Sequence, residues 1–150
     1  REYAPFVYYG EELGQQGHKP DENLREPMDW YKKSKGIGMT SSPNKSVALE
    51  YTVPNDGISL EEEKDNKDSI YEYTRKLIQI RKENPEIING KYTKLDFGYK
   101  INAYEISNPD KKITVVHNSN SKEVKVKIDE KNFTVPKFSS IIVKEGKNLL

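Results

Sequence analysis

Residues 5–14 read Pro-Phe-Val-Tyr-Tyr-Gly-Glu-Glu-Leu-Gly. The apolar residues follow one another without alternation and stop at Gly10, a pattern typical of a strand buried on both faces, as in a parallel sheet. We therefore expect a strand at residues 3–9. Because the chain opens at Arg1, with no polar lead-in before this core element, we also expect the 150 residues to be a piece of a longer protein.

The next fifty residues contain frequent glycine and proline, so residues 10–58 are expected to form a long loop. Loops of this length are usually functional, disordered or parts of a larger body.

A helix over residues 68–84 is the clearest local signal. Four apolar side chains recur at helical spacing: Ile70, Tyr73, Leu77 and Ile80. Asn84-Pro85 ends this pattern, because proline restrains the residue before it. Upstream, Ser59-Leu60-Glu61-Glu62 matches the S-x-x-E capping box, which predicts a shorter capped turn or helix there.

The remainder of the chain, residues 89–150, reads as β structure. Val124, Val126 and Ile128 alternate with lysines, the pattern of a strand with one wet face. Short strands separated by turn signals indicate an antiparallel β-sandwich. The expected strands are residues 92–97, 103–106, 113–116, 124–128 and 140–143.

Composition excludes several classes of function. Lys and Arg number 25 against 24 Asp and Glu, which gives a net charge of +1. This charge does not attract nucleic acid or an anionic membrane, and we expect neither as a partner. No apolar run is long enough to span a bilayer. The absence of cysteine excludes disulfides, thiolate metal sites and a cysteine nucleophile, and leaves the compartment open.

Residue chemistry alone identifies no enzyme. Arg25-Glu26-Pro27-Met28-Asp29-Trp30 offers a planar cation and an aromatic face that suit a sugar ring. Because tryptophan is buried on average, residue types favour the other interpretation, in which Trp30 packs the loop onto a core and Arg25 pairs with a nearby acid. Glu11 and Glu12 are adjacent, so on a strand they point to opposite faces and cannot easily flank one bond. The two histidines, at 18 and 117, lie far apart without clustered partners, and no metal ligand is expected.

Four of these segments resemble the α-amylase family of glycoside hydrolases. Residues 5–14 are similar to the family's last barrel strand, P-F-I-Y-Y-G-D/E-E-I/L-G, and residues 25–30 to its R-x-P-M-x-W loop. Residues 68–85 are similar to its last barrel helix, and Ile113 to Asn118 to a strand of its C-terminal sandwich. The resemblance covers essentially the whole chain.

The resemblance implies an α+β fragment: the last strand, long loop and last helix of a (β/α)8 barrel in residues 1–88, followed by an antiparallel β-sandwich in residues 89–150. It implies an enzyme that cleaves α-glucosidic bonds in starch or maltooligosaccharides with retention, through an aspartate nucleophile and a glutamate acid/base. The family's Asn-His-Asp block is absent from this sequence, so no catalytic residue is assigned and the chain by itself is expected to be inactive.

Loops after barrel strands face the active site, so the resemblance makes four residues candidates for the rim of the sugar cleft: Tyr9, Glu11, Arg25 and Trp30. For Glu11 and Trp30 support of the loop is the favoured role. Expected partners are an α-glucan, bound through the whole enzyme, and the rest of the barrel or a second copy of the chain. No cofactor is expected in this chain, although the family allows calcium in the whole enzyme, and family analogy is compatible with an extracellular location. The alternative function is a non-catalytic carbohydrate-binding or structural sandwich module.

Overall fold

The computed structural model of this chain describes residues 5–21, 23–33 and 53–150. These residues form two compact units, one of the described residues up to 76 and one of residues 77–150, with the division inside a helix. The fold is α+β, and the strands are antiparallel. Residues 3 and 4 of the expected strand, and residues 22 and 34–52 of the expected loop, lie outside the described residues.

The N-terminal unit contains short helices in its described part. These are the 3-10 helices η1 (Glu11–Leu13) and η2 (Asn23–Arg25), α1 (Leu60–Glu63) and the first half of α2 (Ile70–Glu83). Residues 5–9 are not a strand, which differs from the strand expected at residues 3–9. The physical reason is the lack of a pairing edge, because a strand needs a neighbour for its N–H and C=O groups and none of the described residues supplies one.

The start of α2 is capped by side chains of its own unit. Ser69 Oγ accepts a hydrogen bond from the backbone N–H of Glu72 at 3.1 Å, and Glu63 Oε2 accepts one from Tyr71 N–H at 2.7 Å. The expected capping box at residues 59–62 is modified, because Ser59 Oγ donates to Glu62 Oε2 at 2.8 Å rather than accepting from the backbone. Both expected helices are present, with α2 within the predicted range of 68–84.

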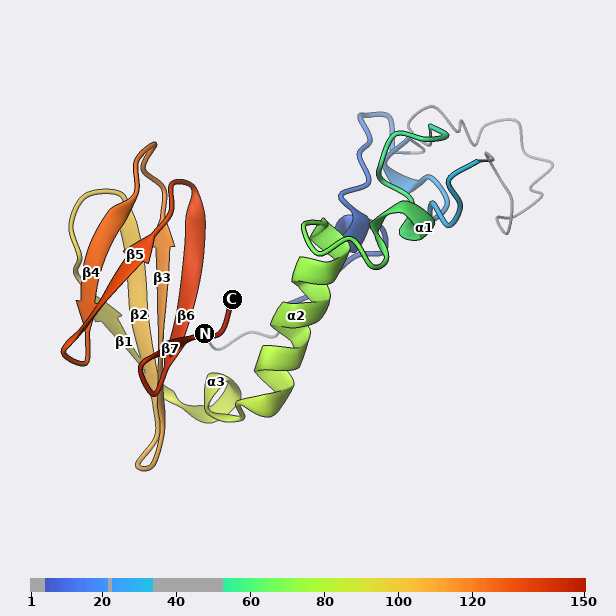
Figure 1. The fold of residues 1–150 in the computed structure, drawn as a ribbon. Helices are drawn as coiled ribbons and strands as arrows, with labels where there is room; N and C mark the ends of the chain where they lie inside the picture. The colour runs from blue at the N-terminus through green and yellow to red at the C-terminus, as the bar shows by residue number, and fades with distance from the viewer. Residues whose placement is uncertain (1–4, 22, 34–52) are drawn as a thin grey trace. The chain divides into compact units, whose positions relative to one another are not determined.

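The C-terminal unit is a β-sandwich joined to the end of α2 by α3 (Glu86–Asn89). Its larger sheet has the order β1-β2-β3-β6-β7 and its smaller sheet pairs β4 with β5 (Figure 1). The strands are β1 (Lys91–Leu95), β2 (Ile101–Ser107), β3 (Lys112–Asn118), β4 (Val124–Ile128), β5 (Lys131–Val135), β6 (Ser139–Lys144) and β7 (Lys147–Asn148). The five expected strands are present, and β5 and β7 were not predicted.

Strand alternation gives the larger sheet two apolar faces. Its inner face packs on the smaller sheet through one buried cluster: Ala103, Val116, Val126, Ile128, Val135, Ile141 and Val143. Its outer face packs on the C-terminal part of α2 and on α3 through a second cluster: Ile80, Ile113, Val115 and Ile142, with Leu77 and Ile87 beside them. The second half of α2 therefore belongs to the core of the sandwich.

Asn118 fastens the end of β3 to the segment that follows β5. Its amide Nδ2 donates to the carbonyl oxygens of Lys122, Val135 and Pro136 at 2.9, 3.1 and 2.9 Å. The side chain is almost completely buried, and of its three hydrogen bonds the one to Val135 is buried while those to Lys122 and Pro136 are partly buried. A single amide thus satisfies backbone acceptors from two different connections of the sandwich.

Candidate functional site

The candidate site lies in the N-terminal unit, where the structure brings two of the four predicted rim residues together. The hydroxyl of Tyr9 donates a hydrogen bond to the backbone oxygen of Arg25 at 3.1 Å, across 16 residues of sequence. The ring of Tyr9 also lies against that of Tyr8, with centroids 4.6 Å apart. Burial, and then the neighbouring Tyr8 hydroxyl, raise the pKa of Tyr9, so its hydroxyl stays protonated and remains a donor at neutral pH.

The guanidinium of Arg25 is held only loosely. Its Nη2 lies 3.5 Å from Asp21 Oδ2, and both side chains are exposed. Asp21 also pairs with Lys19. The ion pair that the sequence suggested for Arg25 is therefore present, but exposed pairs of this kind contribute at most about 1 kcal/mol, which leaves the guanidinium available to a ligand.

Glu11 supports the turn that follows residues 5–9. Its Oε2 accepts a hydrogen bond from the backbone N–H of Tyr8 at 3.1 Å. Gly10 precedes it at φ 89°, a left-handed conformation that glycine adopts without strain. The carboxylate of Glu11 therefore has a structural use in this turn.

Trp30 lies on a segment that is tied to α1 by its backbone. The oxygen of Asp29 accepts from Leu60 N–H at 2.9 Å, and that of Trp30 accepts from Glu61 N–H at 3.2 Å. The indole remains 40% exposed, so it does not plug the loop into a core formed by the described residues. The structure thus presents an aromatic side chain on an anchored backbone.

Gln15 positions the segment between Arg25 and Trp30, a role that the sequence did not reveal. Its Nε2 donates to the backbone oxygen of Pro27 at 2.9 Å, and its Oε1 accepts from the N–H of Asp29 at 3.3 Å. A glutamine in a glycine-rich loop carries no pattern that distinguishes this use from solvation. Only its contacts across 12 and 14 residues identify it.

Asp29 is a buried carboxylate within this segment. The residue is 3% exposed, and its Oδ1 has no hydrogen-bond partner among the described residues. Burial raises the pKa of Asp29, and the charges of Asp56 and Glu62 raise it further, while the backbone N–H of Tyr31 lowers it in part. Glu12 has a similar unpartnered buried oxygen. Sequence reasoning missed both, because only the folded segment removes these oxygens from water.

Three further points concern metal ligands, the histidine on β3 and membrane-spanning helices. Within residues 5–21, 23–33 and 53–150, no group of three or more His, Asp or Glu side chains could hold a metal ion. His117 lies on β3, where its Nδ1 is 2.7 Å from Ser140 Oγ. No helix among the residues described is long and apolar enough to cross a membrane.

Taken together, the segment presents an exposed guanidinium and a half-exposed indole, with a tyrosine that holds the backbone at Arg25 and a glutamine that holds the backbone between Arg25 and Trp30. These groups suit hydrogen bonding and stacking on a neutral ligand that carries hydroxyls. The contacts of Glu11 and the burial of Asp29 do not present a pair of carboxylates to such a ligand.

The chain is similar in sequence and fold to known proteins. The family model "Alpha amylase, catalytic domain" matches residues 2–90. Alpha-amylase 3 of Dictyoglomus thermophilum is 39% identical over 117 residues, which are 77% of this chain and 23% of that protein. Glucan 1,6-alpha-glucosidase of Streptococcus pneumoniae is 33% identical over 111 residues, 73% of this chain and 20% of that protein.

A solved structure agrees with these sequence matches. The alpha-amylase from H. orenii superposes with a TM-score of 0.72 and 27% identity, over 93% of this chain and 32% of that one. The chain therefore spans only about a fifth to a third of the lengths of the proteins it matches.

Proposed function

Because the chain belongs to the α-amylase family of glycoside hydrolases, we propose that it is the C-terminal part of an enzyme that cleaves α-glucosidic bonds in starch or maltooligosaccharides. The observation that carries this proposal is the match of the family's catalytic domain to residues 2–90. The names of the two relatives, an alpha-amylase and a glucan 1,6-alpha-glucosidase, support an α-glucan as the substrate class.

The proposal assigns residues 1–88 to the end of the catalytic barrel and residues 89–150 to a C-terminal sandwich. Two observations support this assignment. The family match ends at residue 90, next to the first strand of the sandwich at Lys91. In the N-terminal unit, the apolar side chains of residues 6–9 are exposed, and Phe6 is 95% exposed. A surface of this kind suits a strand whose neighbours come from another part of the enzyme.

The catalytic carboxylates of this enzyme are proposed to lie outside the 150 residues. Retaining cleavage needs a nucleophile and an acid/base on opposite sides of one bond. The sequence contains no Asn-His-Asp block, and the carboxylate of Glu11 is occupied by the turn at Tyr8. The chain alone is therefore proposed to be inactive.

The four rim residues are proposed to serve the sugar cleft in different ways. Arg25 would donate hydrogen bonds to sugar hydroxyls, because its own ion pair is long and exposed. Trp30 would offer its half-exposed indole to a sugar face. Tyr9 positions Arg25 through the backbone hydrogen bond, and Glu11 stabilises the turn that carries Tyr9.

Hydrolysis assays on two proteins test this function. The 150-residue chain and the protein from the whole coding sequence are each incubated with maltoheptaose, and new reducing ends are measured. We expect reducing ends from the whole protein and only the buffer blank from the chain. Hydrolysis by the pure chain would overturn the assignment of the carboxylates, whereas a whole protein that neither hydrolyses nor transfers α-glucosyl groups would overturn the function.

A further inference from the structure

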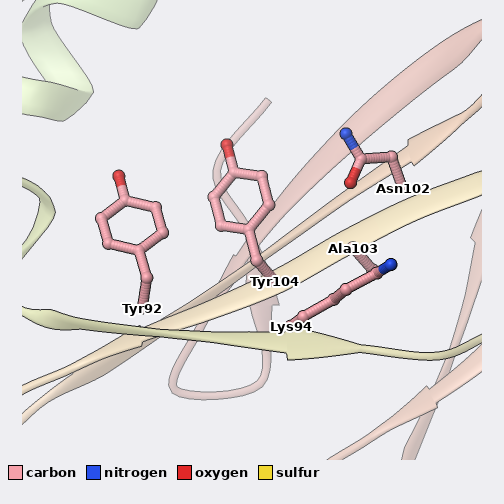
Figure 2. Close-up of a pocket in the computed structure, with 5 residues that line it drawn as sticks. All are labelled: Tyr92, Lys94, Asn102, Ala103 and Tyr104. Carbon is pink, nitrogen blue, oxygen red and sulfur yellow. The ribbon is translucent and has the colours of Figure 1, made fainter. Parts of the chain in front are cut away.

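The outer face of the larger sheet of the sandwich carries a hollow of about 360 Å³. It is lined by Tyr92 and Lys94 of β1 and by Asn102, Ala103 and Tyr104 of β2. Its size falls at the lower end of the range of small-molecule sites, which is about 300–1,000 Å³. Figure 2 shows the two tyrosine rings side by side, with both hydroxyls pointing away from the strands, and Lys94 and Asn102 next to them.

Strand register explains why these side chains gather. Lys94 lies directly opposite Tyr104 in the β1–β2 pairing, and Tyr92 lies opposite Ile106, one diagonal step from Tyr104. Side chains two residues apart on a strand share a face, so residues 92, 94, 102 and 104 all project outward. The side chain of Ala103 projects the other way, into the buried inner cluster, so this residue lines the hollow with its backbone.

The tyrosines belong to an aromatic row across three strands. The ring centroids of Tyr92 and Tyr104 are 5.5 Å apart with planes at 31°, and those of Tyr104 and His117 are 5.9 Å apart at 47°. Tyr104 also packs against the apolar cluster of the outer face, whereas Tyr92 stays 39% exposed. The row therefore combines a fixed ring with an accessible one.

The polar groups beside the rings are available to a ligand. Lys94 and Asn102 are exposed, and neither side chain has a hydrogen-bond or ion-pair partner among the described residues. The two residues supply an ammonium, an amide donor and an amide acceptor. With a single cation and two tyrosine faces, the hollow suits a neutral polyhydroxylated ligand better than an anion.

Ring geometry narrows the class of sugar. The C–H bonds on the face of a pyranose ring carry slight positive charge and pack well on the negative face of a tyrosine. A flat β-linked glucan fits rings that are coplanar, whereas a curved α-linked glucan fits rings that are tilted to each other. The angle of 31° between Tyr92 and Tyr104 therefore favours the curved chain.

We propose that Tyr92, Lys94, Asn102 and Tyr104 form a binding site for an α-glucan chain on the sandwich, separate from the loop of Arg25 and Trp30. The choice of an α-glucan rests on the proposed function, while the site itself rests on the hollow and its aromatic row. The site holds the polymer without cleaving it, and Tyr92 is the principal contact.

Titration of the full 150-residue chain with maltoheptaose, followed by amide NMR, tests the site. We expect chemical-shift changes at the backbone amides of Tyr92, Lys94, Asn102 and Tyr104, and smaller changes with cellohexaose. Tyr92→Ala should weaken maltoheptaose binding roughly three- to tenfold, the range expected for the loss of one aromatic contact. Tyr99→Ala is the matched control, because Tyr99 is 82% exposed on the turn between β1 and β2 and does not line the hollow.

A second variant covers the case in which Tyr92→Ala disturbs the sheet. Asn102→Ala removes only an exposed amide, so the amide spectrum of the sandwich should be preserved while maltoheptaose binds more weakly. Unchanged shifts at β1 and β2 on addition of sugar, or equal weakening by Tyr99→Ala, would overturn the site. Equal changes with cellohexaose would overturn the α-glucan assignment.

The outcome is independent of the hydrolysis assay. If the whole protein hydrolyses maltoheptaose but the amides of β1 and β2 do not respond, only the sandwich site is wrong. If these amides respond but the whole protein neither hydrolyses nor transfers α-glucosyl groups, only the enzymatic proposal is wrong.

Discussion

The ammonium of Lys144 on β6 lies 2.7 Å from Oε1 of Glu86 on α3, and the two side chains are only 15% and 1% exposed. The same ammonium donates to Asn84 Oδ1, and the amide of Asn84 donates to the backbone oxygen of Ile80 at 2.6 Å. The end of α2 is thus joined to the sheet by a charged network as well as by apolar contacts.

Removing the cation should destabilise the sandwich strongly. In Lys144→Met the apolar stem is retained but Glu86 stays buried without its partner, and breaking a buried pair in this way costs about 3–5 kcal/mol. Denaturant unfolding of the chain measures the loss. Lys147→Met, at an exposed lysine on β7, is the control and should change the free energy of unfolding by less than about 0.5 kcal/mol.

Acid should reduce the difference in the free energy of unfolding between the unaltered chain and Lys144→Met. Burial by itself raises the pKa of Glu86, but the hydrogen bond from Lys144, a backbone hydrogen bond and the charges of Lys144 and Lys111 together outweigh it and hold the pKa below its ordinary value. The stabilisation is therefore present above the ordinary glutamate pKa of about 4.3 and is lost as the pH falls through the lowered value in the folded state. An equal loss of stability in Lys144→Met at neutral and at acid pH would contradict this account.

Replacing Asn118 should also destabilise the sandwich. Asn118→Ala leaves the carbonyl groups of Lys122, Val135 and Pro136 without this donor, and the buried carbonyl group of Val135 left unsatisfied should by itself cost about 1–3 kcal/mol. Thermal unfolding is the measurement. Asn132→Ala, at an exposed position of β5, should leave the melting temperature nearly unchanged. Equal changes of melting temperature in the two variants would show that the hydrogen bonds of the Asn118 amide contribute little to stability.

The contribution of the buried carboxylate of Asp29 to stability should depend on pH in the opposite direction to that of Glu86. Its pKa is raised, chiefly by burial, so its unfavourable effect on stability is absent below the ordinary aspartate pKa of about 3.9 and grows as the pH rises through the raised value. Asp29→Asn should therefore raise the melting temperature at pH 7 and have little effect near pH 3. A scan of both proteins against pH measures this, with the exposed Asp68→Asn as control.

Arg25→Lys tests the proposed sugar contact in the whole enzyme. Lysine keeps the charge but loses the planar fork of donors, so kcat/KM on maltooligosaccharides should fall about tenfold, as for the loss of one charged hydrogen bond. The melting temperature should stay the same, because the pair with Asp21 is exposed. Arg75→Lys on α2 is the control, and a drop in stability with unchanged kinetics would assign Arg25 to the ion pair instead.

Hydrogen exchange should separate the two units of the isolated chain. The amides of β3 and β6 lie inside the larger sheet and should exchange slowly. Those of residues 6–9 belong to residues with exposed side chains and have no strand partner in the part of the chain that the structure describes, so they should exchange fast. Slow exchange at residues 6–9 in a proven monomer would show that this segment forms a core of its own, whereas slow exchange only in the whole protein would support the barrel assignment.

Elements with a strong local pattern could be predicted from the sequence. The stripe of Ile70, Tyr73, Leu77 and Ile80 gave the position of α2, and the alternation around Val126 gave β4. β5 was missed because the turn before it, Asp129-Glu130, adopts φ of 48° and 64° without glycine or asparagine. Asp129 and Pro136 do mark turns in the sequence, but without the Asn-Gly or Asp-Gly pair of a two-residue turn they did not identify a hairpin with a strand between them.

Features that depend on tertiary contacts could not be predicted. Residues 5–9 have the composition of a buried strand, but the described residues contain no neighbouring edge for it. The hydrogen bond from Tyr9 to Arg25 spans 16 residues of loop, and no periodicity reports such a contact. Tyr92 and Tyr104 are adjacent only because the β1–β2 register makes them so.

The helical residues in the outer-face cluster set a limit on how this sandwich can be moved between proteins. A transplanted segment that starts at Gly90 would leave Leu77, Ile80 and Ile87 behind and would expose the apolar side chains of β3 and β6 that they cover. It would also leave Lys144 without its carboxylate. Chimaeras between relatives should therefore be joined inside α2, before Leu77, so that the sandwich keeps the half of the helix that covers its outer face.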